Sequence, residues 1–149
     1  MGKGQFEFKY YNGKQILEEE QELLRQMHSV FKSRACNKEG VLEYLSEDTT
    51  VCCMFDGDNC VGFSWLAFCN EEHLAELCWF VTDKNKLGGL EAKIMLDEVL
   101  GYCKAQGVKS VKFNCFDKAW GRIKDREKLF KKFGFDVSDD EMYDVSIDI

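Results

Sequence analysis

The sequence has no proline among its 149 residues, and it has no internal repeat, low-complexity tract or linker-like segment. We therefore assign residues 1–149 to a single domain, whose length suits one hydrophobic core. No apolar run is long enough to span a bilayer, which predicts a soluble domain without a membrane partner. No apolar stretch follows the one basic residue of Met1–Gln5, so no export signal is readable and we expect a cytoplasmic location.

Metal-binding and nucleophilic cysteine patterns are scarce as well. The chain has eight cysteines but no C-x-x-C pair, and its two histidines are His28 and His73. Without an export signal we expect most cysteines to be thiols in apolar surroundings, and the missing ligand spacing predicts no metal site. A cysteine nucleophile would need His28 or His73 as its base, and the buried-thiol interpretation is the simpler one.

Positive charge is also in the minority, because the formal net charge is −7. This balance opposes attraction to the phosphates of nucleic acids, so we expect no nucleic-acid partner. A cationic or amine substrate is easier to accommodate, although a solvated acidic surface explains the same charge.

Along the chain, segments in which apolar residues recur at the spacing of a strand alternate with segments in which they recur at the spacing of a helix. Alternating apolar and polar residues predict strands, and apolar residues at helical spacing predict helices. The predicted order is a strand over 6–11, helices over 16–31 and 41–45, strands over 51–55, 61–67 and 74–81, a helix over 92–103, a strand over 111–115, a helix over 126–133, and a strand over 145–149. Gly107 and Gly134 are expected to end the last two helices. This order predicts an α+β or mixed α/β sandwich.

A pair of glycines marks the most informative segment. Gly88 and Gly89 lie between the strand over 74–81 and the helix over 92–103. Glycines at such a junction let backbone amides approach a ligand closely, and the start of a helix favours an anion. Lys84 and Lys86 would add positive charge. The alternative is that the glycines only make a tight turn.

This segment resembles the pyrophosphate loop of the GNAT superfamily of acyl-CoA-dependent N-acyltransferases, which has the form Q/R-x-x-G-x-G/A. Lys86 stands at the basic position, Gly89 at the first glycine, and Glu91 where the family has a small residue. A carboxylate there would repel the diphosphate unless its side chain turns outward. Shifting the frame to Asn85, Gly88 and Leu90 does not restore the pattern. The resemblance implies that the cofactor contacts Lys86, Leu87, Gly88, Gly89 and Leu90.

Residues 127–135, EKLFKKFGF, resemble the closing helix of the same family and its LYEKLGF signature. Phe130 stands where the family often has a tyrosine that protonates the thiolate of CoA, so another route, such as water, would be needed. The resemblance places Phe130 beside the cofactor. Arg122, Lys124 and Arg126 either meet CoA phosphates or form a solvated basic face.

Residues 75–78, AELC, resemble the strand segment that carries a catalytic glutamate in histone-type members of the family. The resemblance implies that Glu76 is the general base, and the alternative is an ordinary exposed strand glutamate. His73 is a weaker substitute. By the same resemblance, the backbones of Phe80 and Val81 would pair with the pantetheine arm, where the fourth and fifth strands diverge.

The family implies a GNAT-like mixed, mostly antiparallel sheet flanked by about four helices, with strands four and five parallel and splayed. It implies an N-acetyltransferase that moves an acetyl group from acetyl-CoA (coenzyme A) to an amine by direct attack. The alternative is a catalytically inactive GNAT-like binding or regulatory module. A structural interaction protein with the same layers is a third interpretation. A small-molecule or peptide amine is the expected acceptor, and a homodimer is a family-level expectation.

Overall fold

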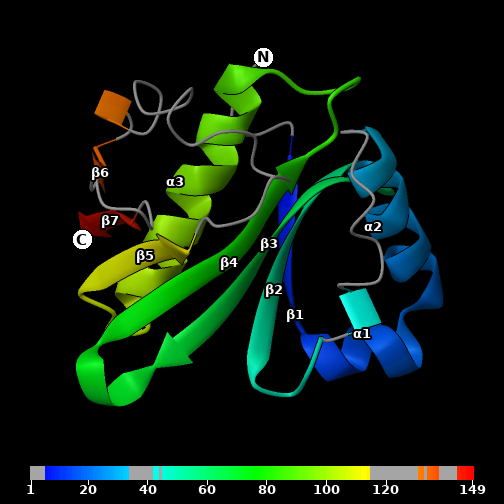
Figure 1. Ribbon diagram of the computed structural model, residues 1–149. Coiled ribbons are helices and arrows are strands. Elements are labelled where there is room, and N and C mark those ends of the chain that lie inside the picture. The colour runs from blue at the N-terminus through cyan, green and yellow to red at the C-terminus, as the bar shows by residue number, and fades with distance from the viewer. Residues whose placement is uncertain (1–5, 34–41, 44, 115–130, 133, 138–143) are drawn as a thin grey trace.

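Strands and helices follow one another much as the hydrophobic pattern predicts (Figure 1). The structure is a computed structural model that describes residues 6–33, 42–43, 45–114, 131–132, 134–137 and 144–149. The elements are β1 (Glu7–Asn12), α1 (Gly13–Glu19), α2 (Gln21–Ser33), β2 (Thr49–Asp56), β3 (Asn59–Cys69), the 3-10 helix η3 (Asn70–Glu72), β4 (Leu74–Thr82), α3 (Gly89–Ala105), β5 (Ser110–Asn114), β6 (Asp136–Val137) and β7 (Asp144–Asp148).

The strands form one sheet in the order β1-β2-β3-β4-β5-β7-β6. β4 and β5 are parallel, and the other neighbouring strands are antiparallel. This confirms the predicted mixed, mostly antiparallel sheet. β6 was not predicted, because a strand of two residues is too short to show an alternating pattern.

The first predicted helix is divided into two. Glu20 separates α1 from α2 with a non-helical backbone (φ −117°, ψ 61°), although the apolar spacing continues through it. Asn12 caps α1 by accepting a hydrogen bond from the N–H of Lys14 at 3.0 Å. Position 13, directly after Asn12, requires glycine, because a Cβ there would lie 2.2 Å from Oγ1 of Thr49.

Two further predicted helices lie largely outside the described residues. Of the helix over 41–45, Leu42 and Glu43 have 3-10 geometry, and of the helix over 126–133, Lys131 and Lys132 are helical. The described helices include none that is long and apolar enough to cross a membrane.

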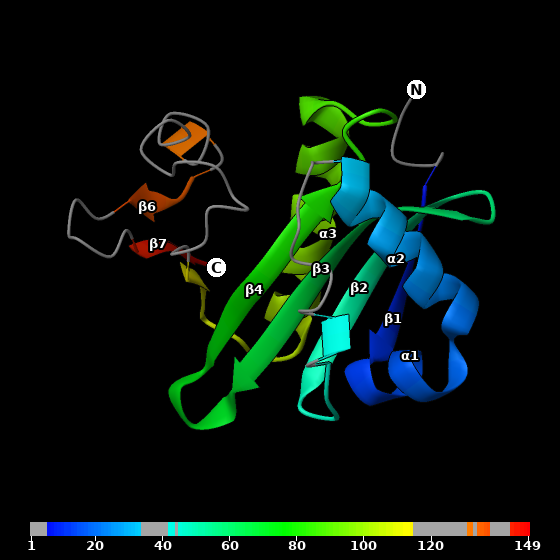
Figure 2. The same cartoon turned by 45° about the vertical axis from the view of Figure 1, so that its right-hand side comes forward.

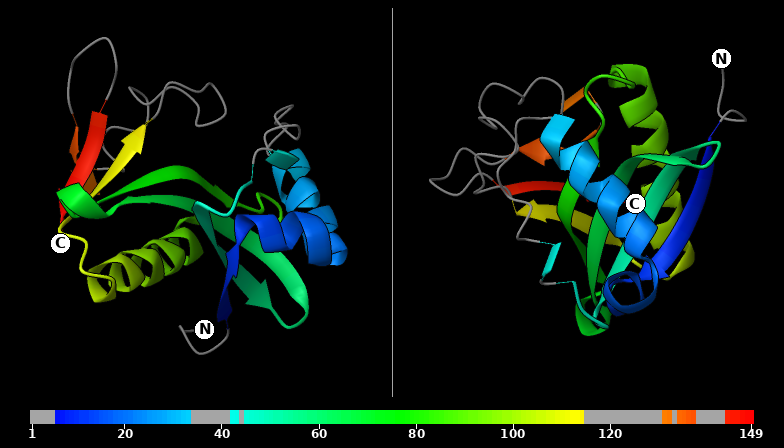
Figure 3. Two further views of the ribbon diagram at one scale, coloured as in Figure 1. Left: turned by 90° about the horizontal axis from the view of Figure 1, so that it is seen from below. Right: turned by 90° about the vertical axis from the view of Figure 1, so that its right-hand side faces the viewer.

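Helices cover both faces of the sheet, with α1 and α2 on one face and α3 on the other (Figures 2 and 3). On the first face the ring of Phe31 in α2 makes edge contacts with Phe63 in β3 and Trp79 in β4, at centroid distances of 5.2 and 5.3 Å. On the second face α3 buries Met95, Leu96, Val99 and Cys103, as its spacing predicts. β2 and β3 are accordingly buried along most of their length.

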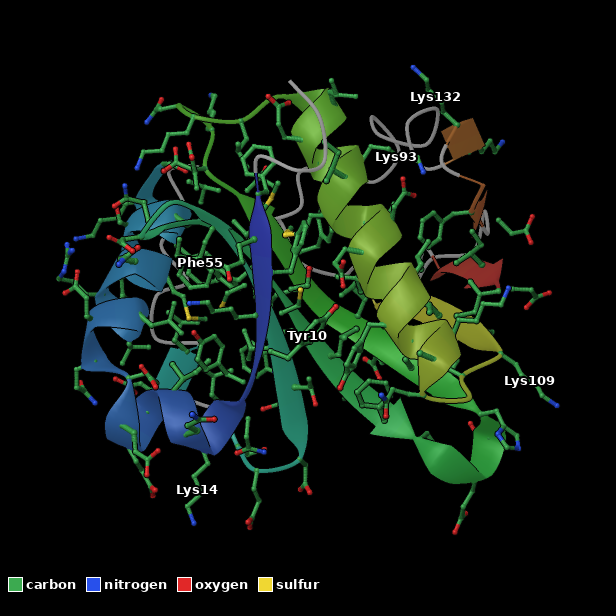
Figure 4. All side chains as sticks on the ribbon, turned by 180° about the vertical axis from the view of Figure 1, so that it is seen from behind. Tyr10, Lys14, Phe55, Lys93, Lys109 and Lys132 are labelled. Carbon is green, nitrogen blue, oxygen red and sulfur yellow. The ribbon has the colours of Figure 1, made fainter. Side chains whose placement is uncertain are left out.

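Two contacts define the end of α3 and its position on the sheet. At its end, Gly107 has a positive φ of 85° and Val108 donates to the carbonyl of Cys103, which confirms the predicted stop. At the edge of the sheet, Tyr10 of β1 lies beside α3 (Figure 4) and its hydroxyl donates to Oε2 of Glu98 at 2.7 Å. The helix is therefore tied to the edge strand β1 as well as packed on the face of the sheet that it covers.

Candidate functional site

β4 and β5 separate part of the way along their length. Their parallel pairing runs from Leu74 opposite Ser110 to Leu77 opposite Phe113. β4 then continues for five residues to Thr82, whereas β5 ends at Asn114. Figures 2 and 3 show the two strands fanning apart. The predicted parallel and splayed pair is confirmed.

A β-bulge in β4 explains the divergence. Trp65 of β3 lies opposite Trp79 and Leu66 lies opposite Leu77, so Cys78 is an extra residue on β4. A bulge bends its strand and increases the local twist. The extra residue comes directly after the last pair with β5, where it turns the end of β4 away. No local composition signals the bulge, and it was not predicted.

The ladder between β3 and β4 assigns the side chains to faces, because directly opposite residues project to the same side. Trp79 contacts Phe31 and therefore faces α2. Glu76 lies opposite Ala67, two positions along β3 from the partner of Trp79, and so it faces α2 as well. Phe80 lies opposite Ser64 on the face of α3, and Val81 is buried on the face of α2.

Glu76 is half-buried between the neighbouring strands. Its register partner in β5 is Lys112, so the carboxylate has a cationic neighbour in the adjacent strand. His73, the weaker alternative base, is exposed in the turn before β4 and has a positive φ of 52°. Glu76 is thus the predicted base that lies on the sheet itself, next to the bulge.

The thiol of Cys78 lies at the bulge and stays protonated at neutral pH. Burial, and to a smaller extent the charge of Glu76, raises its pKa to about 11. Its Sγ donates weakly to the carbonyl oxygen of Glu76 at 3.9 Å. Since the thiolate is the nucleophilic form, this cysteine is a poor covalent catalyst. The six cysteines among the described residues carry free thiols, and no group of three or more metal-ligating side chains gathers in those residues.

Two buried polar groups of β3 lie beside the bulge at Cys78. Within the described part of the chain, Oγ of Ser64 and Nε1 of Trp65 have no hydrogen-bond partner. Ser64 is opposite Phe80 and Trp65 is opposite Trp79, so they flank the bulge from opposite faces. Buried polar groups are normally paired, and unpaired ones are concentrated at functional sites. The sequence signal is a serine inside an apolar strand, and the two unpaired groups were not predicted.

The loop after β4 is held at several points. The N–H of Asp83 donates to the carbonyl of Val61 at 2.8 Å, and its buried carboxylate accepts from the N–H of Asn85 at 2.9 Å. Its carbonyl accepts from the N–H of Leu87 at 3.0 Å. The N–H of Lys84 donates to Oγ of Ser33, at the end of α2, also at 3.0 Å. These tertiary anchors were not predicted, and they preorganise the path into α3.

The loop leads into a helix start that has free donors. Gly88 is the N-cap of α3, and the first backbone bond of the helix runs from the N–H of Ala92 to the carbonyl of Gly88 at 3.1 Å. The N–H groups of Gly89, Leu90 and Glu91 therefore have no intrahelical acceptor. The predicted glycine pair thus stands at the positive end of the helix dipole, where an anion is favoured.

The other residues predicted to touch the cofactor differ in exposure. Lys86 is exposed, Leu87 is half-buried against the core, and Leu90 is 68% exposed, the one large hydrophobic side chain left open among the described residues. The carboxylate of Glu91 does not turn outward, because its Oε2 accepts the N–H of Gly88 at 3.3 Å. Phe130 and the basic residues Arg122, Lys124 and Arg126 lie outside the described residues.

No protein-family model and no curated protein matches the sequence. Many solved structures resemble the chain over nearly its full length. Among them are the PaiA N-acetyltransferase of Thermoplasma acidophilum in complex with coenzyme A (TM-score 0.71, 14% identity, 97% of this chain and 99% of that chain), Tetrahymena GCN5 (0.74, 12%, 96% and 96%) and the aminoglycoside 6′-N-acetyltransferase of Enterococcus faecium (0.68, 10%, 94% and 94%). At these identities the likeness concerns the fold. The chain has the fold of the GNAT N-acetyltransferases.

Proposed function

We propose that the protein is an N-acetyltransferase that moves an acetyl group from acetyl-CoA to an amine by direct attack. The observation that carries this proposal is the divergence of β4 from β5 at the Cys78 bulge, next to an anchored loop that ends in free helix N–H groups. The fold of solved N-acetyltransferases, one of them described in complex with coenzyme A, supports the same ligand.

The residues present fit the two ends of acetyl-CoA. Gly89, Leu90 and Glu91 offer helix N–H groups without an intrahelical acceptor to a diphosphate, and a Cβ on Gly89 would meet nothing within 4 Å among the described residues, so the approach is open there. Lys84 and Lys86 would add positive charge from the exposed side of the loop. From the end of β4 at Thr82 back to Glu76 is six residues, or about 20 Å of strand, along which an extended arm would pass Val81 and Phe80.

Glu76 would act on the acceptor. Its carboxylate takes a proton from the ammonium group, directly or through a water, so that the neutral amine attacks the thioester carbon. The C–N bond forms, the C–S bond breaks, and the thiolate leaves and takes up a proton. Because Cys78 is a protonated thiol at neutral pH, direct attack is favoured over an acyl-cysteine intermediate.

One observation favours a second candidate, a catalytically inactive GNAT-like binding or regulatory module. The Glu91 carboxylate already accepts the N–H of Gly88, where an active enzyme would receive the diphosphate. In either case we propose a small-molecule or peptide amine as the molecule that meets the α2 face.

Calorimetric titration with acetyl-CoA tests the proposal first. Saturable binding with a rise in melting temperature is expected, and no heat or stabilisation at millimolar acetyl-CoA would refute the enzyme. A panel of amines with chromatographic detection of free CoA then separates them, since the inactive module would release none.

The variant Glu76→Gln tests the mechanism. It should keep its affinity for acetyl-CoA while turnover falls by about 10²–10⁴-fold, the usual contribution of a general base. Glu72→Gln is the matched control, because Glu72 is exposed in η3 and the charge change is the same. Unchanged turnover in Glu76→Gln would remove Glu76 from the mechanism.

A further inference from the structure

Glu91 occupies part of the helix start that a diphosphate would use. It is the third residue of α3, and its Oε2 accepts the N–H of the N-cap residue Gly88 at 3.3 Å. In a complete capping box the N-cap side chain also bonds the N–H of the third residue. Glycine has no side chain, so only the half contributed by Glu91 forms. The helix start is therefore partly satisfied by an anion that belongs to the chain.

The carboxylate and a diphosphate have the same requirements. Both are anions stabilised by free N–H groups and by the positive end of the helix dipole, and they repel each other when close. In the part of the chain that the structure describes, no ion pair neutralises Glu91, and Lys93, two residues further on, pairs with Asp97. An incoming diphosphate would therefore meet a carboxylate that has no ion-pair partner among the described residues.

The carboxylate is held loosely enough to move. Its hydrogen bond of 3.3 Å is long, and no second hydrogen bond holds it among the described residues. Gly88 and Gly89 place no side chain against it, and the nearest atom to a Cβ built on Gly88 would be Oε2 of Glu91 itself, at 3.6 Å. Rotation of one side chain would free the N–H of Gly88.

We propose that Glu91 is an internal competitor for the diphosphate of CoA, and that CoA binding displaces its carboxylate from Gly88. This inference rests on the proposed function, because it takes the diphosphate as the ligand. It makes residue 91 a determinant of CoA affinity, and it assigns a role to the position where this chain departs from the family pattern.

Two variants separate the effect of the charge of Glu91 from the effect of its hydrogen bond with the N–H of Gly88. Glu91→Gln keeps an oxygen that can accept the N–H of Gly88 and removes the charge, whereas Glu91→Ala removes both. Glu72→Gln makes the same change in net charge at the opposite end of β4. The test is to measure the dissociation constant of each variant by calorimetry, for CoA and for dephospho-CoA, which retains the diphosphate. The melting temperature of each variant is measured without ligand.

We expect Glu91→Gln to bind both ligands about tenfold more tightly than the wild type, a change of about 1.4 kcal/mol. Glu72→Gln should bind as the wild type does. Glu91→Ala should also bind more tightly but melt at a lower temperature, because it loses the cap. If the wild type binds CoA and Glu91→Gln binds equally or more weakly, this inference is wrong and the proposed function stands. If neither the wild type nor the variants bind CoA at millimolar concentration, the proposed function fails, and the inference fails with it.

Discussion

Replacement of Ser64 by alanine should stabilise the protein, although serine-to-alanine changes in a core usually have little effect. Ser64 is 0% exposed, and its hydroxyl has no hydrogen-bond partner among the described residues. Burial of an unpaired hydroxyl costs about 1–3 kcal/mol. Loss of the oxygen leaves a space of about 10 Å³, which costs about 0.2 kcal/mol at about 24 cal/mol per Å³. The free energy of unfolding should therefore rise by about 1–3 kcal/mol.

Urea unfolding followed by tryptophan fluorescence measures this change, and a thermal melt should show a rise of about 2–4 °C for each kcal/mol. Thr49→Val is the matched contrast, because Oγ1 of Thr49 donates to the carbonyl of Ser46 at 2.7 Å and accepts its N–H at 3.1 Å. That variant should lose about 1–2 kcal/mol. If Ser64→Ala were destabilised like Thr49→Val, the hydroxyl of Ser64 would have a hydrogen-bond partner in the folded protein. It would then no longer mark the Cys78 bulge as a functional site.

Two further predictions concern the core. Gly13→Ala should cost more than about 2 kcal/mol in urea unfolding, because the new Cβ would lie 2.2 Å from Oγ1 of Thr49; a cost no greater than that of Gly101→Ala, a helical position in α3 where nothing lies within 4 Å, would contradict this. Burial raises the pKa of Cys52 to about 12 and that of Cys103 to about 11, above the ordinary 9.0. As the pH rises, these thiols ionise at a lower pH in the unfolded chain than in the folded protein. The free energy of unfolding should therefore fall between pH 9 and 11, by at most about 1.4 kcal/mol per pH unit for each thiol. A stability that stays constant across this range would exclude them as buried thiols.

The spacing of apolar residues along the sequence was sufficient to predict most of the helices and strands. Apolar residues of β4 and α3 carry a strong local pattern, since each element buries a defined face. The break at Glu20 was missed because the apolar spacing continues from α1 into α2, and backbone dihedrals leave no trace in that spacing. The parallel pairing of β4 and β5 came from the resemblance and not from the pattern, because period does not specify the partner of a strand.

The candidate site was predictable only where one residue type has a local meaning. Gly88 and Gly89 could be recognised because glycine at a strand-to-helix junction is informative on its own. The anchor from Lys84 to Ser33 joins residues 51 positions apart, and such tertiary bonds have no local signal. The bulge at Cys78 was equally invisible, although it bends β4 and so creates the divergence on which the proposed function depends.

The most direct test of that divergence as the CoA site is a titration of the ¹⁵N-labelled protein with CoA, followed by amide resonances. If CoA binds there, the largest shifts should occur at Gly89, Leu90 and Glu91 and along residues 80–82, with β1 and β2 unchanged. Shifts confined to β1 and β2, or none at saturating CoA, would contradict it.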